Sequence, residues 1–283
     1  MRVHEEVLRP ISPYPFPWSF FTFLDAFPES VRLDPPPIEP LTGAADESFD
    51  LVILAYQVWF LSPSLPVTSF LTSDAGRRLL AGKPVVTVVA CRNMWLMAQE
   101  TVKRLLQEAG AHLVDHVAFV ERANVLATLI TTPRWLLTGR RDDFLGLPRA
   151  GIAEADIAGA SRFGRALADA LRNDSEKTGK PMLTGLRAAI VDPAIIMSER
   201  TGHRAFRIWS GFVRRFGKAG QLRRRPVLAL FVCYLIVMIV TVVPLSLVLR
   251  RALSPLLRKR LVAMKTAYEQ PSGSEGFNLA RYE

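Results

Sequence analysis

The sequence contains few of the residues that form disulfides or bind metal ions. Its 283 residues include two cysteines, Cys91 and Cys233, and four histidines. Cys91 lies in a predicted strand and Cys233 in a long apolar run, so we expect neither a disulfide nor a metal site. Walker loops, dinucleotide fingerprints, zinc spacings and Ser–His–Asp motifs are also missing. The polar start, Met1–Glu6, predicts no signal peptide.

Acidic residues are outnumbered by basic ones. The chain has 36 Lys and Arg against 26 Asp and Glu, a formal net charge of +10. The excess is concentrated in the C-terminal third, next to a hydrophobic run. We therefore expect membrane lipid with anionic headgroups as the partner, and no nucleic acid.

The middle of the chain has the pattern of a parallel α/β sheet. Apolar runs at 51–56 and 84–90 do not alternate, which predicts strands buried on both faces, and a Val-rich run at 111–120 predicts a third. Apolar residues at helical spacing predict an amphipathic helix over 94–110, with Asn93 as its N-cap. A second helix is expected over 67–80, although Gly76 interrupts it.

Ligands of such sheets bind beyond the carboxyl ends of the strands, here 57–63 and 91–95. The pattern Tyr-x-x-Trp-Phe-x-Ser-Pro-x-x-Pro over 56–66, followed by a helix and Gly-Lys-Pro-Val-Val, resembles the flavodoxin-like superfamily. Over roughly residues 3–170 the chain is more similar to the bacterial dialkylresorcinol condensing enzyme family, which is flavodoxin-like. The strings Asn93–Met97 and Pro15–Trp18 are the more distinctive part of this resemblance.

The resemblance implies a flavodoxin-like three-layer parallel sheet that binds FMN and takes part in oxidoreductase chemistry. Two loops flank the flavin ring in that fold. The residues that match those loops, and that we expect to bind the cofactor, are Gln57, Trp59, Ser62, Asn93 and Trp95. Loop packing and helix capping are the alternative roles for the same side chains.

One part of the flavodoxin-like pattern is missing. The first strand and its Ser/Gly-rich loop, whose backbone N–H groups would cradle the flavin phosphate, cannot be found. We expect the sequence to begin at the second strand, Val3–Leu8, which would then have to pair with 51–56. Either the natural start lies further upstream, or the phosphate site has been lost. FMN binding is therefore expected only if that loop exists.

Cys91 is a weak candidate for a catalytic residue. It ends a predicted strand at the ligand edge, and the neighbouring Arg92 would favour a thiolate able to act in acyl transfer. The nearest histidines in a neighbouring strand are His112 and His116. A small cysteine packed at the end of a strand is the alternative.

Two further helices are predicted in the first 172 residues. Ser19–Phe27 is aromatic on most sides, which suits packed core, a ligand lid or a membrane-contacting lip, and Pro28 is expected to end it. The second runs over 153–171, with Ile157, Phe163, Leu167 and Leu171 as its buried positions. A polar linker at 173–180 is then a domain boundary.

The C-terminal third has the pattern of a membrane segment. Arg204–Lys218 alternates Arg with aromatic residues, as helices at a membrane interface do. Val227–Leu249 is uncharged and long enough to span a bilayer core of about 30 Å. We expect a single pass through the inner (cytoplasmic) membrane, with the domain facing the cytoplasm. A helical hairpin dipping into one leaflet, with both ends on that side, is the alternative.

These patterns divide the chain into a truncated flavodoxin-like domain (1–172), a linker with a basic helix (173–226), a transmembrane helix (227–249) and a basic, then disordered tail (250–283). Two classes of function follow. The first is a membrane-tethered redox enzyme that makes lipid-like aromatic or polyketide products of the dialkylresorcinol type. The second is a non-catalytic module that recruits a lipid-synthesis enzyme, such as a ketosynthase, to the membrane.

Overall fold

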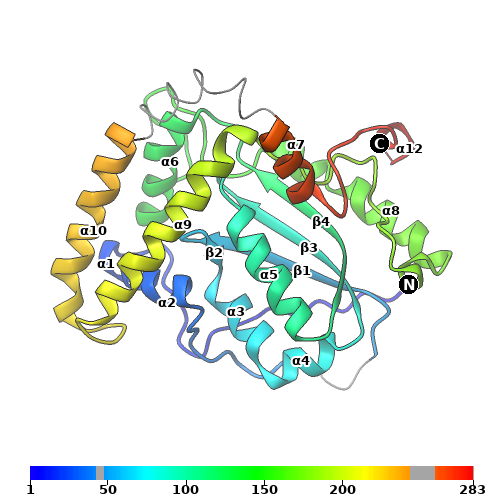
Figure 1. Ribbon diagram of the computed structural model, residues 1–283, viewed down its shortest axis with the longest axis horizontal. Helices are drawn as coiled ribbons and strands as arrows, with labels where there is room; N and C mark the ends of the chain where they lie inside the picture. Colours follow the sequence, from blue (N-terminus) through cyan, green and yellow to red (C-terminus); the bar gives the residue numbers. More distant parts are fainter. Residues whose placement is uncertain (43–47, 243–258, 283) are drawn as a thin grey trace.

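Three parallel strands form the centre of the protein. The computed structural model describes residues 1–42, 48–242 and 259–282. Strands β1 (Val52–Trp59), β3 (Pro84–Cys91) and β4 (His112–Val120) are parallel, and the short β2 (Ser62–Pro63) pairs antiparallel with the end of β1, in the order β2-β1-β3-β4 (Figure 1). The three strands predicted from apolar runs are confirmed.

The helices that connect these strands are α3 (Leu65–Thr72), α4 (Asp74–Leu80) and α5 (Leu96–Glu108). The helix predicted over 67–80 is two helices, because Ser73 is extended and its Oγ accepts a hydrogen bond from Gly76 N at 3.0 Å. A side chain at Gly76 would collide with the Phe70 carbonyl, so glycine suits this close turn. The amphipathic helix α5 is confirmed, but Trp95 rather than Asn93 stands at its N-cap.

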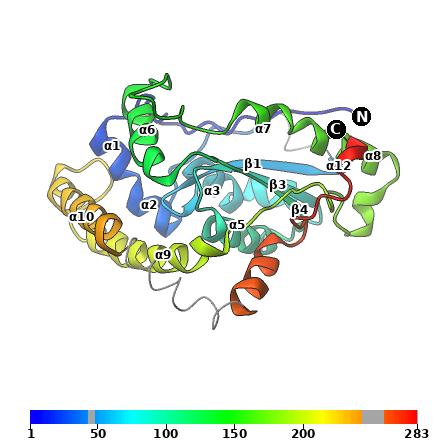
Figure 2. The same ribbon diagram turned by 90° about the horizontal axis from the view of Figure 1, so that it is seen from above.

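The two faces of the sheet are covered unequally. Seen from above in Figure 2, α5 lies on one side of the sheet and α6, α7 and α8 on the other. Leu54, Tyr56 and Val89 pack under α5, in the larger apolar core. On the opposite face α8 covers β3 and β4, but Ile53 of β1 is 55% exposed. The expectation that β1 is buried on both faces is therefore wrong.

The stretch after β4 is helical. Helix α6 (Val125–Thr138) comes first. The helix predicted over 153–171 is broken into α7 (Glu154–Ala158) and α8 (Ser161–Arg172). Phe163 and Leu167 are buried as expected, whereas Ile157 is exposed because α7 lies outside the core and has no buried residue.

Residues 1–42 and 48–50, as far as the structure describes this part of the chain, form no strand of the sheet. Val3–Leu8, expected to pair with β1, is irregular, and the nearest pairing is a single bridge between Pro10 and Ile38. Two short helices follow, α1 (Phe20–Asp25) and α2 (Phe27–Arg32). Pro28, expected to end a helix, lies in the first turn of α2, where its missing N–H costs no hydrogen bond.

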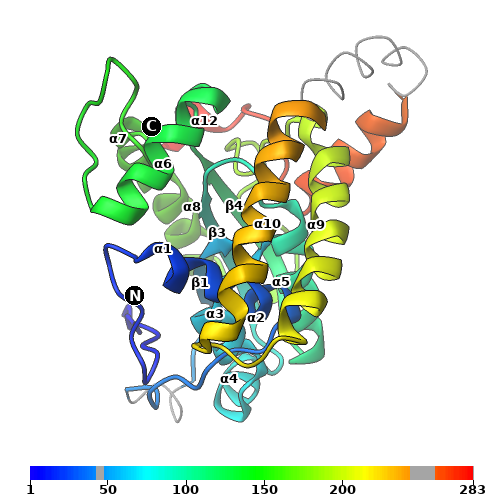
Figure 3. The same ribbon diagram turned by 90° about the vertical axis from the view of Figure 1, so that its left-hand side faces the viewer.

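Two long helices form an antiparallel pair on one side of the sheet (Figure 3). Helix α9 (Pro193–Arg214) is followed by a 3₁₀ turn (Leu222–Arg224), α10 (Arg225–Val237) and a π-helical turn (Met238–Val242). Phe231 of α10 stacks on Phe27 of α2, with ring centroids 4.0 Å apart. The remainder of the predicted membrane helix, 243–249, lies outside the described residues.

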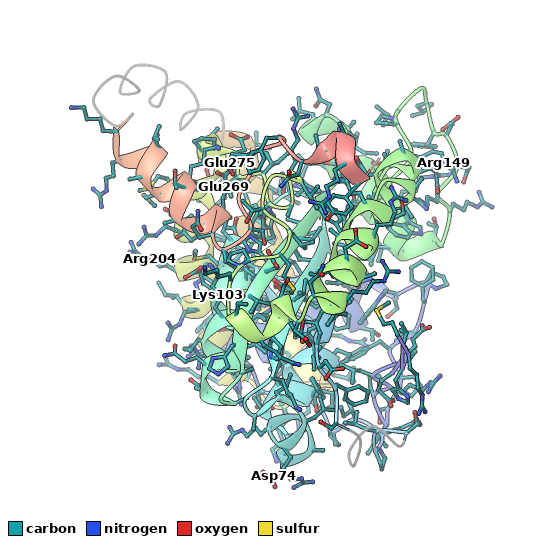
Figure 4. The ribbon with its side chains drawn as sticks, turned by 90° about the vertical axis from the view of Figure 1, so that its right-hand side faces the viewer. Asp74, Lys103, Arg149, Arg204, Glu269 and Glu275 are labelled. Atoms are coloured by element: carbon teal, nitrogen blue, oxygen red, sulfur yellow. The ribbon has the colours of Figure 1, made fainter. Side chains whose placement is uncertain are left out.

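The C-terminal segment packs against the body. Residues 259–269 are helical, and α12 (Leu279–Tyr282) ends the described chain. Ser272 is fully buried, donates to Asp115 Oδ1 at 2.7 Å and accepts from His116 N at 2.7 Å. The backbone N–H of Arg187 donates to Glu275 O at 2.8 Å. The expectation of a disordered tail is therefore wrong for residues 270–282, and Figure 4 shows Glu269 and Glu275 close together at this junction.

We predict that Ser272→Ala destabilises the protein by about 1–3 kcal/mol, because His116 N and Asp115 would each lose a buried hydrogen-bond partner. The measurement is the urea midpoint of the full chain in detergent micelles. Thr266→Ala is the matched control, since this exposed hydroxyl bonds only within its own helix. Equal midpoints for the two variants would show that the tail is not held by Ser272.

Candidate functional site

The carboxyl edge of the sheet brings together only some of the residues expected to bind a cofactor. Asn93 and Trp95 line one cavity of about 560 Å³ at the ends of β3 and β4. Gln57 is exposed on the uncovered face of β1. Ser62 is buried in β2, beside a different cavity between α2, α5 and α9. The five residues therefore do not line a single pocket.

Trp59 belongs to an aromatic cluster rather than to an open platform. Its ring makes edge contacts with Tyr14 at 5.1 Å and Trp18 at 5.5 Å. Its indole N–H donates to the Gln57 side chain at 3.4 Å. The half-buried Trp59 ring therefore packs with Tyr14 and Trp18 of the Pro-rich segment.

The cavity beside Asn93 contains charges of both signs. Arg122 is paired with Asp156 at 2.6 Å, and the Arg162 guanidinium lies 4.2 Å from the centre of the Phe163 ring. The volume suits a small molecule. The charged side chains that line it are Arg122, Arg162, Arg187, Glu121, Asp156 and Asp192. Because the positive and negative charges of this lining nearly cancel, they give the cavity no preference for a phosphate.

Glu199 of α9 occupies the position where a parallel sheet most readily binds an anion, the N-terminus of α5. Its Oε1 accepts from Met97 N at 2.7 Å, while Oε2 is buried without a hydrogen-bond partner. Burial raises the pKa of Glu199 to about 7, and backbone hydrogen bonds from Met97 and Leu96 oppose the shift. The protein thus caps α5 with its own carboxylate.

The environment of Cys91 is opposite to the one the sequence suggested. Burial raises the pKa of its thiol well above the usual range, Glu199 adds to the shift, and Arg92 only partly offsets it. A thiolate is therefore disfavoured. His116 pairs in register with Thr87 rather than Cys91, which is four residues or about 13 Å further along β3. Cys91 has no histidine base beside it in β4.

A second buried polar cluster was not foreseen from the sequence. Asp115 accepts from the backbone of Met182 at 2.6 Å and from Ser272, and burial raises its pKa to about 6. Burial lowers the pKa of His116 to about 3, and neither ring nitrogen has a hydrogen-bond partner. His116 contributes only its backbone N–H to this cluster, so Ser272, His116 and Asp115 are not a catalytic triad.

The apolar helix α10 is partly buried and partly exposed. By length and composition Leu222–Thr241 could cross a membrane, and 22% of its most apolar window is buried. Val227, Leu228 and Phe231 are buried in the first turns. From Ile236 onward, Ile236, Val237 and Val240 are more than half exposed, whereas Met238 and Ile239 are half-buried. The exposed set on α10 and its π-helical turn is Leu230, Ile236, Val237 and Val240.

The start of α10 is held by a buried ion cluster. Arg224 is fully buried and pairs with Asp25 at 3.2 Å and with Glu29 at 3.0 Å. The acidic partners of Arg224 lie almost two hundred residues earlier in the chain. This arginine therefore attaches α10 to α1 and α2.

Among the residues that the structure describes, no group of three acidic, histidine or cysteine side chains could hold a metal ion. No family model, no curated protein and no solved structure matches the chain. Its function must therefore be argued from its own surfaces.

Replacing Glu199 should change how stability depends on pH. The folded protein holds the pKa of Glu199 near 7, above the ordinary value of 4.5, so the folded state binds a proton that the unfolded state has lost. Stability from this group is present below pH 4.5 and is lost as the pH rises through 7. We expect Glu199→Gln to match wild type at pH 4.5 and to exceed it at pH 8 by up to about 3 kcal/mol.

The measurement is a set of urea unfolding curves at the two pH values, on full chains in detergent micelles. Glu100→Gln is the control, because this carboxylate lies on the exposed side of α5 and pairs with Lys103. A constant difference between Glu199→Gln and wild type at both pH values would contradict the assignment.

Proposed function

We propose that the chain is a membrane-attached α/β module that inserts an apolar hairpin into one leaflet and holds a partner at the membrane. The observation that carries the proposal is the docked C-terminal segment. The first turns of α10, at the start of the apolar run, and residues 259–282 after the run contact the same body. The single crossing that the sequence predicts would place these two parts on opposite sides of a bilayer, so the contacts favour the hairpin.

The length of the intervening chain also supports a hairpin. Sixteen residues, 243–258, separate the described part of α10 from the helical residues 259–269. A chain of that length that goes out and returns has about eight residues in each direction. In helical form, which satisfies backbone groups in lipid, eight residues reach about 12 Å. This reach falls well short of a bilayer core of about 30 Å.

The outer surface of the helix pair suits an interface. Ile208 of α9 is 74% exposed, and Phe212 and Phe216 are exposed near Arg215. Phe16 and Phe20 add exposed aromatic rings near the start of α1. Apolar and aromatic residues mixed with arginines favour the boundary between headgroups and acyl chains. This surface supports attachment along the helix pair as well as through the hairpin.

The proposal has two further parts: the fold is flavodoxin-like, and the protein does not catalyse a flavin-dependent reaction. The consecutive parallel order β1-β3-β4, with α5 on one face and α8 on the other, supports the first part. The dispersal of the five expected flavin residues and the raised pKa of Cys91 support the second. By the resemblance, the partner that such a module would recruit is a lipid-synthesis enzyme of the ketosynthase type.

The hairpin proposal predicts that both termini lie on one side of the membrane. Cysteines introduced at two exposed sites, Glu5→Cys and Arg281→Cys, should react with a membrane-impermeant maleimide in the same preparation, either spheroplasts or inverted vesicles. Background labelling is measured on the parent chain. Labelling of the two sites in opposite preparations would restore the single-pass membrane helix.

The binding-module proposal predicts that the chain does not bind FMN tightly. A flavin phosphate must be desolvated without a loop of converging N–H groups, and ring stacking adds only about 1 kcal/mol. Quenching of flavin fluorescence, titrated with the full chain in micelles, should show no saturation at micromolar protein. Riboflavin is the control, because it lacks the phosphate. Tight binding of FMN over riboflavin would contradict this proposal and favour a redox enzyme.

A further inference from the structure

A cavity of about 490 Å³ lies between α2, α5 and α9, away from the ends of β3 and β4. Its basic lining comes from all three helices: Arg32 from α2, Arg104 from α5, and His203 and Arg207 from α9. Figure 4 labels Lys103 of α5 and Arg204 of α9, the chain neighbours of the lining residues Arg104 and His203. Three guanidinium groups and an imidazole therefore surround one small space.

The acidic charge near the cavity is already neutralised. Glu100, the only carboxylate among its described lining residues, pairs with Lys103 Nζ at 3.0 Å. Arg104 pairs with Glu108 at 2.5 Å, on an exposed part of α5. The cavity consequently keeps a net positive charge, unlike the balanced cavity beside Asn93.

Arg32 is held in a fixed orientation. Its Nε donates to Ser210 Oγ at 3.0 Å and its Nη2 donates to the Arg207 carbonyl at 2.6 Å. Gly211 allows this close approach, because a side chain there would collide with the guanidinium. A guanidinium that is already oriented loses little freedom when it binds an anion, and its planar set of donors matches phosphate oxygens.

We propose that Arg32, Arg104, Arg207 and His203 form a binding site for a phosphate group. Several arginine donors around a space of this size suit the many oxygens of a phosphate better than a lone carboxylate. The phosphate could belong to a free small molecule or to a lipid headgroup, since α9 also carries the exposed aromatic residues Phe212 and Phe216. The site goes beyond the proposed membrane attachment and does not depend on insertion of the hairpin.

His203 provides a direct readout of this site. Burial lowers its pKa, and Arg207 lowers it further. The charged groups that line the cavity with His203 are Arg32 on α2, and Arg104 and Glu100 on α5. A bound phosphate would place negative charge beside the imidazole and favour its protonated form, so the pKa of His203 should rise by about one unit.

The experiment is NMR titration of the full chain, labelled at its four histidines, in phosphate-free maltoside micelles. Potassium phosphate is added at constant ionic strength, with potassium chloride as the reference. A second arm adds short-chain phosphatidate instead. A rise in the His203 pKa with inorganic phosphate supports a site for free phosphate, and a rise with phosphatidate alone supports a lipid headgroup. No shift in either arm would overturn the proposal.

Two variants separate binding from general charge effects. Arg104→Gln removes one lining arginine without breaking the contact between α2 and α9, and should weaken phosphate binding about tenfold. Arg78→Gln removes the same charge from an exposed site on α4 and should change nothing. Equal phosphate affinity of the two variants would exclude this cavity. In the same titration, a His116 pKa that stays near 3 shows that the variant keeps its folded core.

Discussion

The ion cluster of Arg224 with Asp25 and Glu29 constrains the whole apolar end of the protein. A buried guanidinium is tolerated only when carboxylates pair with it, and removal of one partner leaves an uncompensated buried charge. Because Arg224 immediately precedes α10, the cluster and the Phe27–Phe231 stack hold the beginning of that helix in the body. Apolar side chains of this helix are exposed at Leu230 and again at Ile236, Val237 and Val240. The apolar helix is therefore part of the domain rather than an appendage on a linker.

The second constraint acts on the far side of the apolar run. Glu269 accepts from Val191 N at 3.1 Å, and Ser272 is bonded to Asp115 in β4. The chain is thus attached before residue 243 and again after residue 258. The sixteen residues between these two attachments, 243–258, include Arg250 and Arg251 at their midpoint.

Local patterns predicted the elements that depend on local physics. The apolar runs became β1, β3 and β4, and the periodic stretch after Asn93 became α5, because continuous apolar runs and helical spacing are properties of neighbouring residues. The misplaced parts depend on distant partners. Glu199 lies 102 residues from Met97, Arg224 lies 195 from Glu29, and Ser272 lies 157 from Asp115. Each resembles an ordinary surface residue until its partner is known. The predicted flavin residues do not line one pocket for the same reason. Trp59, for example, packs against Tyr14, which is distant in the sequence.

The carboxyl edge of the sheet and the helix pair α9 and α10 are physically joined through Glu199. In parallel α/β folds the N-terminus after a strand is a site for anions, and here α9 fills it with a buried carboxylate. The same helix carries Ser210 and the Arg207 carbonyl that orient Arg32, and it packs along α10. A displacement of α9 would therefore expose the α5 terminus, disturb the cavity between α2, α5 and α9, and shift α10 together.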